Sequence, residues 1–361
     1  MDLVQDHIRA MKPYEAVESS EVLAERAGIP PDKVVRLNGN ENPYSSAPKV
    51  TETLGSYDQY NRYPDPDQHQ IRAVLSDYLD VEPERIVAGN GSDEIIDLTL
   101  RMVLAPGDRI LDPTPTFGMY AICANICGGK VVSVPRDDSF EIDVEATKLA
   151  LDSRTRAVLF ASPNNPTGNI AQEWQVRSLL ETGVLVVVDE TYYEFCGQTV
   201  MPLVREYPNL MVLRTFSKWA GLAGLRIGLG VMDPEMAQVM MAVKPPYNVN
   251  VGAEIALMAS LADKAVLIKR VQSIVAERER MFSLIEGIPG VKPWPSQANF
   301  ILCQLPEGKG RAVFEGLCRR GVFVRHFSTP RLVDHIRASV GLPHETDALV
   351  DALSDTMKEL A

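Results

Sequence analysis

A single lysine, Lys218, stands in the segment RTFSKWAGLAGLR, which runs from Arg214 to Arg226. The residues after it are small and apolar enough to pack tightly, and a charged amine buried among them would be energetically costly. An ordinary lysine would extend its amine to solvent, whereas a catalytic lysine would be held neutral or as an imine. The hydroxyls of Thr215 and Ser217 and the guanidinium of Arg226 suit a phosphate group, so the segment offers an amine beside an anion site.

A carboxylate follows the most apolar run of the chain. In VVVDETYYEF (Val186–Phe195), Asp189 comes directly after consecutive valines, and we expect it at the end of a strand that is buried on both faces. A buried carboxylate requires a cationic partner, and neither Val188 nor Glu190 provides one. Tyr192, three residues further on, could reach the same ligand.

Two turn segments follow other β-rich runs. In GNGSDE (Gly89–Glu94) the glycines let the backbone approach a ligand, and the free N–H groups of a helix start at Gly91, Ser92 and Asp93 would favour an anion. The same segment is equally compatible with a glycine turn in which Ser92 or Asp93 caps the helix, and it lacks the third glycine of a dinucleotide-binding motif. SPNNPTG offers the amide of Asn165 at a rigid position, or only a turn.

Pyridoxal phosphate satisfies all of these requirements together. Its phosphate suits the helix start and the two hydroxyls with the guanidinium, and its protonated ring nitrogen is the cation that Asp189 lacks. Its phenolate oxygen could accept hydrogen bonds from Asn165 and Tyr192, and its aldehyde could form an imine with Lys218, which removes the cost of an isolated buried ammonium. Phe117 in PTPTFGMY could stack on the ring, or could simply pack in the core.

These residues require a scaffold that brings several strand ends together. Apolar β-rich runs alternate with helical patterns such as Ser92–Leu104 and Gln172–Glu181, which predicts an α/β fold with a mostly parallel sheet covered on both faces. In such a sheet ligands bind at the carboxyl ends of the strands, where the four segments lie. The predicted strands are Arg85–Gly89, Arg109–Asp112, Lys130–Pro135, Ala157–Ser162, Val184–Glu190, Leu210–Thr215 and Arg226–Met232.

The pattern changes after the last of these strands. A long helical stretch is predicted over Ala253–Glu286, then short strands in ANFILCQL and GVFVRHF, and a closing helix near Glu345–Leu360. We therefore expect a large cofactor-binding domain at residues 45–245. A smaller α+β domain would comprise residues 246–361 together with an N-terminal arm, residues 1–44.

Composition narrows the class of protein. The chain has 361 residues and a net charge of −12, which argues against a nucleic-acid partner. No apolar run approaches the about 20 residues of a membrane span, and the N-terminus lacks the order of a signal peptide. An odd number of cysteines, five, predicts free thiols in the cytoplasm. Cys123 and Cys127 have no second pair nearby, so no metal site is predicted.

The order of these motifs resembles the aspartate-aminotransferase-like, fold type I pyridoxal-phosphate enzymes. The matching motifs are Gly89-Asn-Gly-Ser-Asp, Asn164-Asn-Pro-Thr-Gly, Asp189-Glu-Thr-Tyr, Ser217-Lys and Arg226. Within that family, the segments LNGNENPYSS, RYPDP, PPYNVN, SQANFIL and VRHFSTPRLVDHIRASVG are similar to those of the histidinol-phosphate aminotransferases. The similarity extends over nearly the whole chain.

The resemblance implies a seven-stranded, mostly parallel sheet and a homodimer with active sites shared between subunits. In such a dimer Tyr63 would reach the cofactor phosphate of the neighbouring subunit. Tyr14, Asn40, Arg325 and Arg337 would bind the substrate, although surface charge pairing is an alternative for the two arginines.

The implied reaction is a transamination in which Lys218, Asp189 and Tyr192 form the catalytic set. Lys218 would move a proton, and Asp189 would keep the ring nitrogen protonated. L-histidinol phosphate and 2-oxoglutarate would give imidazole acetol phosphate and L-glutamate, which is a step of histidine biosynthesis. Two alternatives on the same scaffold stay open at this point, a threonine-phosphate decarboxylase and an aromatic amino-acid aminotransferase.

Overall fold

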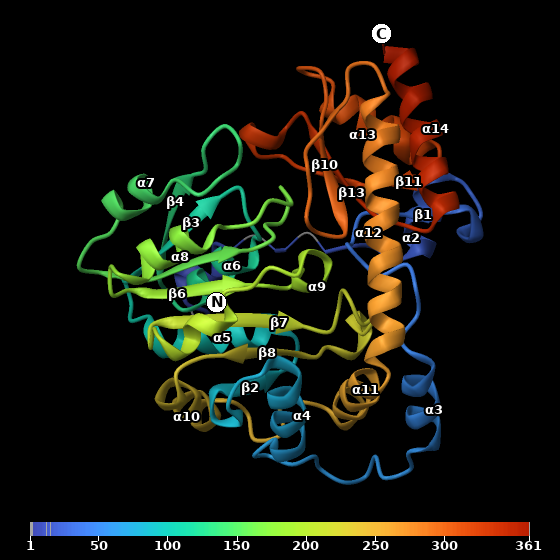
Figure 1. Ribbon diagram of the computed structural model, residues 1–361. Coiled ribbons are helices and arrows are strands. Elements are labelled where there is room, and N and C mark those ends of the chain that lie inside the picture. The colour runs from blue at the N-terminus through green and yellow to red at the C-terminus, as the bar shows by residue number, and fades with distance from the viewer. Residues whose placement is uncertain (1–2, 12, 15, 361) are drawn as a thin grey trace.

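A seven-stranded sheet forms the centre of the computed structural model, which describes residues 3–11, 13–14 and 16–360 (Figure 1). Each of its strands overlaps one of the predicted β-rich runs, because these runs are short, apolar and bounded by turns. In spatial order the strands are β2 (Ile86–Gly89), β8 (Gly228–Val231), β7 (Leu210–Thr215), β6 (Leu185–Asp189), β5 (Thr155–Ala161), β3 (Arg109–Thr114) and β4 (Lys130–Pro135).

The sheet is mostly parallel, as predicted. Strands β4, β3, β5, β6 and β7 pair in parallel, whereas β8 runs antiparallel to both of its neighbours, β7 and β2. The carboxyl ends of β5, β6 and β7 therefore meet at one edge, and the register aligns Ala161 with Asp189 and Asp189 with Leu213. This arrangement confirms the predicted fold class and brings three of the candidate segments together.

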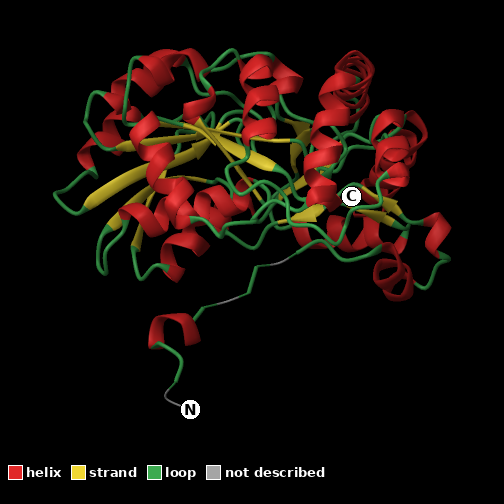
Figure 2. Cartoon of the chain, turned by 90° about the horizontal axis from the view of Figure 1, so that it is seen from below, coloured by secondary structure: helices red, strands yellow, loops and turns green. Residues whose placement is uncertain are grey.

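Two hydrophobic cores lie on opposite faces of this sheet, and they account for its continuous apolar strands. Within β6, Val186 and Val188 belong to one core and Leu185 and Val187 to the other, as the alternation of side chains along a strand requires. Figure 2 shows helices on both sides of the strands. Residues of α5 (Ser92–Val103), α6 (Met119–Ile126) and α10 (Pro234–Val243) join one core, and residues of α4 (His69–Leu79) and α8 (Glu173–Leu180) join the other.

A second, four-stranded sheet lies in the C-terminal part of the chain, in the order β12-β13-β10-β9. The N-terminal segment joins this part, because β1 (Val35–Arg36) pairs in parallel with β11 (Val322–Phe323) (Figure 1). The domain boundaries at residues 45–245, 1–44 and 246–361 stay a prediction. The remaining elements here are β9 (Lys292–Pro293), β10 (Phe300–Gln304), β12 (Arg325–His326), β13 (His335–Ser339), α13 (Gly310–Arg319) and α14 (Pro343–Leu360).

The helical stretch predicted over Ala253–Glu286 is present but interrupted at one residue. The structure has two helices, α11 (Val251–Ala262) and α12 (Lys264–Glu286), separated at Asp263, whose backbone leaves the helical conformation at φ −104° and ψ 23°. Helix propensity is continuous across this junction, so the break comes from how the two helices pack: α11 lies near α3 (Pro48–Ser56), and α12 rises towards the second sheet (Figure 1).

Short helices complete the described chain. They are α1 (Asp6–Arg9), α2 (Ser20–Ala27), α3 (Pro48–Ser56), α7 (Val144–Leu149) and α9 (Tyr193–Cys196), with single 3-10 turns at Pro31–Lys33, Pro83–Arg85, Met201–Arg205, Ala223–Leu225 and Pro330–Leu332. Within residues 3–11, 13–14 and 16–360, no helix combines the length and the apolar character that crossing a membrane demands.

Candidate active site

A cavity of about 340 Å³ opens where the carboxyl ends of β5, β6 and β7 meet. Residues from both sheets and from the N-terminal segment line it, so sequence positions that are far apart converge on one space. The predicted site residues that line the cavity are Tyr14, Asn40, Ser92, Asp93, Phe117, Asn165, Asp189, Tyr192, Thr215, Ser217, Lys218, Arg226, Arg325 and Arg337.

Two predicted site residues do not line this cavity. Gly91 lies just behind it with φ +81°, and a Cβ atom there would stand 2.5 Å from Nη2 of Arg226, so the position requires glycine. Tyr63 is 79% exposed and stacks on Tyr247 with 4.3 Å between the ring centroids. The single chain therefore holds Tyr63 on its surface and outside its own cavity.

Lys218 points its amine into the cavity between two backbone segments. Its Nζ donates to the carbonyl of Gly39 at 3.2 Å, and Nδ2 of Asn42 donates to the carbonyl of Lys218 at 2.8 Å. Burial lowers the pKa of Lys218 to about 8, and the positive charge of Arg337 adds to this effect. A substantial fraction of the amine is therefore neutral near physiological pH, which a nucleophile or a base requires.

Asp189 receives three hydrogen bonds, all from uncharged donors. The backbone N–H and the hydroxyl of Thr191 donate to Oδ1 at 3.0 and 2.5 Å, and the hydroxyl of Tyr120 donates to Oδ2 at 2.9 Å. Burial raises the pKa of Asp189, while these hydrogen bonds oppose the rise. Neither partner is among the residues predicted from the sequence: Thr191 could have been found from its position two residues after Asp189, whereas nothing in the sequence points to Tyr120.

An anion site lies at the start of α5. Neither Ser92 nor Asp93 caps this helix, because the N-cap residue is Gly91 and it makes no side-chain hydrogen bond. Asp93 instead accepts a hydrogen bond from Nη2 of Arg226 at 3.0 Å. Of the two alternatives for this segment, the turn capped by Ser92 or Asp93 is therefore excluded. Ser92 and Asp93, in the first turn of α5, line the cavity, where the N-terminal end of a helix favours an anion.

Two hydroxyls complete the anion site. Thr215 and Ser217 lie side by side at the end of β7, with their oxygens 3.0 Å apart, and the Thr215 hydroxyl is held by the carbonyl of Ile227 at 3.1 Å. Together with Arg226 and the start of α5, they form a set of donors that matches the oxygens of a phosphate.

The opposite end of the cavity contains Arg337, Asn165, Asn40 and Tyr192. Arg337 donates to Oδ1 of Asn165 at 2.6 Å and to the carbonyl of Asn38 at 2.8 Å, but its buried Nε has no partner among the described residues. Burial lowers the pKa of Arg337 to about 10, and nearby Arg325 contributes to this shift. Since Arg337 is only 7% exposed, surface charge pairing does not describe it.

Asn40 links the N-terminal segment to the cavity. Its Nδ2 donates to the hydroxyl of Tyr192 at 2.9 Å, and its backbone N–H donates to the hydroxyl of Ser339 at 2.8 Å. Burial raises the pKa of Tyr192 to about 12, so the phenol stays protonated and can donate. The sequence analysis assigned no role to Ser339, which holds Asn40 from β13.

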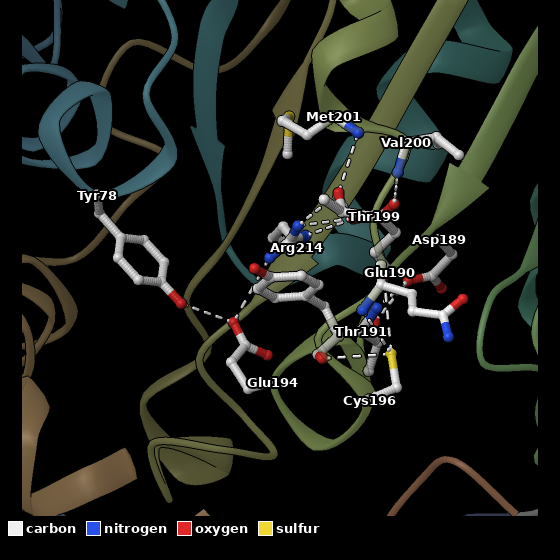
Figure 3. Close-up of polar contacts among 12 residues, drawn as sticks. Tyr78, Asp189, Glu190, Thr191, Glu194, Cys196, Thr199, Val200, Met201 and Arg214 are labelled. Carbon is white, nitrogen blue, oxygen red and sulfur yellow. Dashed lines mark hydrogen bonds and ion pairs between the residues drawn. The ribbon is translucent and has the colours of Figure 1, made fainter. Parts of the chain in front are cut away.

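A separate charged cluster lies next to Asp189, outside this cavity (Figure 3). Glu190 accepts hydrogen bonds from Nε of Arg214 at 2.8 Å and from the backbone N–H of Val200 at 2.7 Å. Arg214 also lies 3.5 Å from the ring centroid of Tyr193 and 3.7 Å from Glu194. Glu190 therefore has its own cation, and this pair fixes the ends of β6 and β7 to each other.

The residues present fit the predicted pyridoxal phosphate. The start of α5 with Arg226 offers an anion site, and Oδ2 of Asp189 accepts only one hydrogen bond from the described chain, so a further lone pair can meet a protonated ring nitrogen. Because Arg337 occupies Oδ1 of Asn165, the amide NH₂ of Asn165 is the group that can donate to a ligand. Lys218 supplies the amine.

Comparison with known proteins agrees with this arrangement. The sequence profile of the family described as Aminotransferase class I and II matches residues 32–353. A protein of Roseiflexus castenholzii named histidinol-phosphate aminotransferase is 44% identical over 362 aligned positions, which cover 98% of each chain. The chain therefore belongs to the class I and II aminotransferase family.

Solved structures show the same fold. The histidinol-phosphate aminotransferase of Sinorhizobium meliloti, solved with pyridoxal-5'-phosphate, superimposes with a TM-score of 0.91 at 26% identity, covering 100% of this chain and 99% of that one. The L-threonine-O-3-phosphate decarboxylase of Porphyromonas gingivalis has a TM-score of 0.77 at 21% identity, covering 90% of this chain and 100% of that one. At that identity the second likeness concerns the fold alone.

Proposed function

We propose that this aminotransferase binds pyridoxal 5'-phosphate and transfers the amino group of L-histidinol phosphate to 2-oxoglutarate, which yields imidazole acetol phosphate and L-glutamate. The observation that carries the proposal is the pairing, in one cavity, of a half-buried lysine with a pKa of about 8 and a buried aspartate that has no cationic partner among the described residues. The substrate is proposed from the near full-length similarity to a relative with that name.

The cofactor would be held at four points. Ser92, Thr215, Ser217 and Arg226 would bind its phosphate together with the backbone at Gly91 and Asp93, and Asp189 would pair with its ring nitrogen. Asn165 and Tyr192 would donate to its phenolic oxygen, and Phe117 would lie against the ring. The support for this assignment is that these side chains, Gly91 excepted, line a single cavity.

When bound, the cofactor supplies an aldehyde that reacts with amines and a ring that accepts electrons from the substrate carbon. Lys218 takes the proton from the substrate carbon that bears the amine, since its low pKa leaves it partly neutral. Asp189 stabilises positive charge on the ring nitrogen, and its burial keeps water from weakening this interaction.

Substrate selection would fall to Arg325 and Arg337, with Tyr14 and Asn40. The two substrates present a phosphate and a carboxylate in turn, and a planar guanidinium can pair with either group. The Nε of Arg337 supports this role, because a buried donor without an acceptor among the described residues suits an acceptor on a ligand.

We also propose a cytoplasmic homodimer in which Tyr63 completes the phosphate site of the neighbouring subunit. The exposed position of Tyr63, outside the cavity of its own chain, supports this assembly. The free state of all five cysteines supports a reducing compartment.

The test is an assay of purified protein with 2-oxoglutarate and one of four amines: histidinol phosphate, unphosphorylated histidinol, threonine phosphate or phenylalanine. We expect glutamate formation with histidinol phosphate, a preference of more than about tenfold over unphosphorylated histidinol, and no turnover by Lys218→Ala. Release of CO₂ from threonine phosphate would instead establish the decarboxylase. A preference for phenylalanine would establish the aromatic aminotransferase.

A further inference from the structure

Tyr120 makes the only hydrogen bond that the described chain gives to Oδ2 of Asp189. The distance is 2.9 Å, whereas Oδ1 is held twice by Thr191, through its backbone N–H and its hydroxyl. Oδ1 alone would leave the carboxylate free to rotate about its last bond. The hydroxyl of Tyr120 removes that freedom, because it fixes the second oxygen from a different element, α6.

The ring of Tyr120 also supports Phe117, which forms part of the cavity wall. Tyr120 packs edge-on against Phe117, with ring centroids 5.6 Å apart and an interplanar angle of 85°. Phe117 lines the cavity, and Tyr120 itself is fully buried behind it. One side chain therefore contacts both the carboxylate and the aromatic wall, and neither contact can change without moving the other.

The surroundings of Tyr120 keep its hydroxyl a donor. Burial raises the pKa of this phenol well above its usual value, and the nearby carboxylates of Asp189 and Asp112 add to the effect. The other titratable groups that face the pair are Asp93 from α5 and Tyr192. The phenol thus stays protonated near neutral pH.

We infer that Tyr120 is a positioning residue that fixes the Asp189 carboxylate and braces Phe117, so that both meet the ring of the bound cofactor in one geometry. The inference rests on the proposed function, since it concerns how the chain receives pyridoxal phosphate. Tyr120 does not line the cavity and touches no ligand there, so it acts only through Asp189 and Phe117.

The test compares Tyr120→Phe with Tyr78→Phe. The control makes the same chemical change, because the hydroxyl of Tyr78 donates to Glu194 at 2.8 Å, in the charged cluster outside the cavity (Figure 3). The melting temperature of each apoprotein, the Kd for pyridoxal phosphate by fluorescence titration, and kcat and KM are measured at about pH 6 and about pH 8, on either side of neutrality.

We expect Tyr120→Phe to weaken cofactor binding by about tenfold to hundredfold, which is the loss expected for one hydrogen bond to a charged group. The loss should be larger near pH 6, because Asp189 without this donor takes up a proton more readily. We expect kcat to fall while KM stays nearly constant, and Tyr78→Phe to match the unmutated protein in cofactor affinity.

A double-mutant cycle with Asp189→Asn shows whether Tyr120 acts through this carboxylate. If it does, Tyr120→Phe should have little further effect on the Kd in the Asp189→Asn background. Equal effects in both backgrounds, or equal Kd values for Tyr120→Phe and Tyr78→Phe, would overturn the inference while leaving the proposed function intact. Failure of the unmutated protein to bind pyridoxal phosphate would overturn both.

Discussion

Two consecutive carboxylates at the end of β6 have opposite environments. Asp189 faces the cavity and receives only uncharged donors, from Thr191 and Tyr120. Glu190 faces the other way and pairs with the guanidinium of Arg214, with both side chains under 5% exposed (Figure 3). Of these two carboxylates, the one without a cationic partner in the described part of the chain is therefore the one with access to a ligand.

The same contrast holds for two buried arginines. Arg214 directs its donors at Glu190 and Thr199 and lies over the ring of Tyr193. Arg337 donates to Asn165 and a backbone carbonyl and leaves its buried Nε unpaired. In these two pairs, Asp189 and Glu190 and then Arg337 and Arg214, the member that lines the cavity is paired less completely by the described residues than the member outside it.

The largest effect should come from removing the charge at Asp189. We expect Asp189→Asn to fold normally and to lose about two to four orders of magnitude in kcat/KM, since leaving a buried charge without its partner costs about 3–5 kcal/mol. The measurement is the rate of the half-reaction with histidinol phosphate in a stopped-flow instrument. A rate near that of the unmutated protein would show that the chain does not use this carboxylate to hold a cation.

Glu190→Gln should lower the stability of the protein and leave its activity nearly unchanged, which is the reverse of the effect expected for Asp189→Asn. The guanidinium of Arg214 would lose its main counter-charge, so we expect a loss of about 3 kcal/mol in the free energy of unfolding. Because Glu190 does not line the cavity, kcat for the folded fraction should stay within a few-fold of its normal value. Denaturant unfolding and active-site-titrated assays measure the two quantities separately. A selective loss of kcat without a loss of stability would mean that Glu190, like Asp189, serves the reaction and does not stabilise the fold.

Arg337→Lys should have a smaller effect on activity. Lysine keeps the charge but loses the planar fork, so we expect KM to rise by about one to two orders of magnitude for both substrates, corresponding to about 1.5–3 kcal/mol. Cofactor absorbance should be unchanged, because Arg337 lies at the substrate end. The control, Arg214→Lys, should lower the melting temperature and leave KM unchanged. A change in KM for only one substrate would mean that different residues bind the phosphate and the carboxylate.

The sequence predicted the central sheet well because its strands are apolar, short and separated by helical patterns. It also predicted that Lys218, Asp189 and Arg226 would converge. Asp189 ends β6, Lys218 follows β7, and Arg226 precedes β8, which runs antiparallel to β7 and so begins at the same edge of the sheet. The sequence did not predict Tyr120, because an aromatic residue in an apolar helix has the same pattern whether it only packs or also donates. The break at Asp263 was missed for a similar reason, since helix propensity is local and packing is not.

Strand β13 shows a further limit of sequence patterns. Its residues His335–Ser339 are all buried, and two of them, Arg337 and Ser339, are polar residues that contact the cavity network. Polar residues at buried positions weaken the apolar alternation from which a strand is recognised. Buried polar residues of this kind are expected at functional sites, where residues that bind a ligand replace the apolar residues that the strand pattern favours.

The smallest expected effect concerns Glu194. Its carboxylate is paired less closely with Arg214 than that of Glu190 is, but unlike that of Asp189 it lies near a guanidinium. Its Oε1 accepts from Tyr78, but its buried Oε2 has no partner among the described residues, and it lies 3.7 Å from Arg214. Burial raises its pKa from 4.5 to about 7, although Arg214 opposes the shift and Glu190 adds to it. Between about pH 4.5 and pH 7, Glu194 is therefore protonated in the folded protein and ionised in the unfolded chain. The contribution of this group to the free energy of unfolding is full below pH 4.5 and is lost as the pH rises towards 7.

Glu194→Gln removes this dependence, because an amide does not titrate. We expect the variant to resemble the unmutated protein at about pH 5 and to be more stable by about 1–3 kcal/mol at about pH 8, where the native carboxylate is ionised without full pairing. Melting temperatures across this range provide the measurement, and Glu286→Gln, at an exposed position, corrects for the change in net charge. A stability difference that does not grow with pH would mean that Arg214 neutralises Glu194 as fully as it does Glu190, and that the cluster contains no partly paired carboxylate.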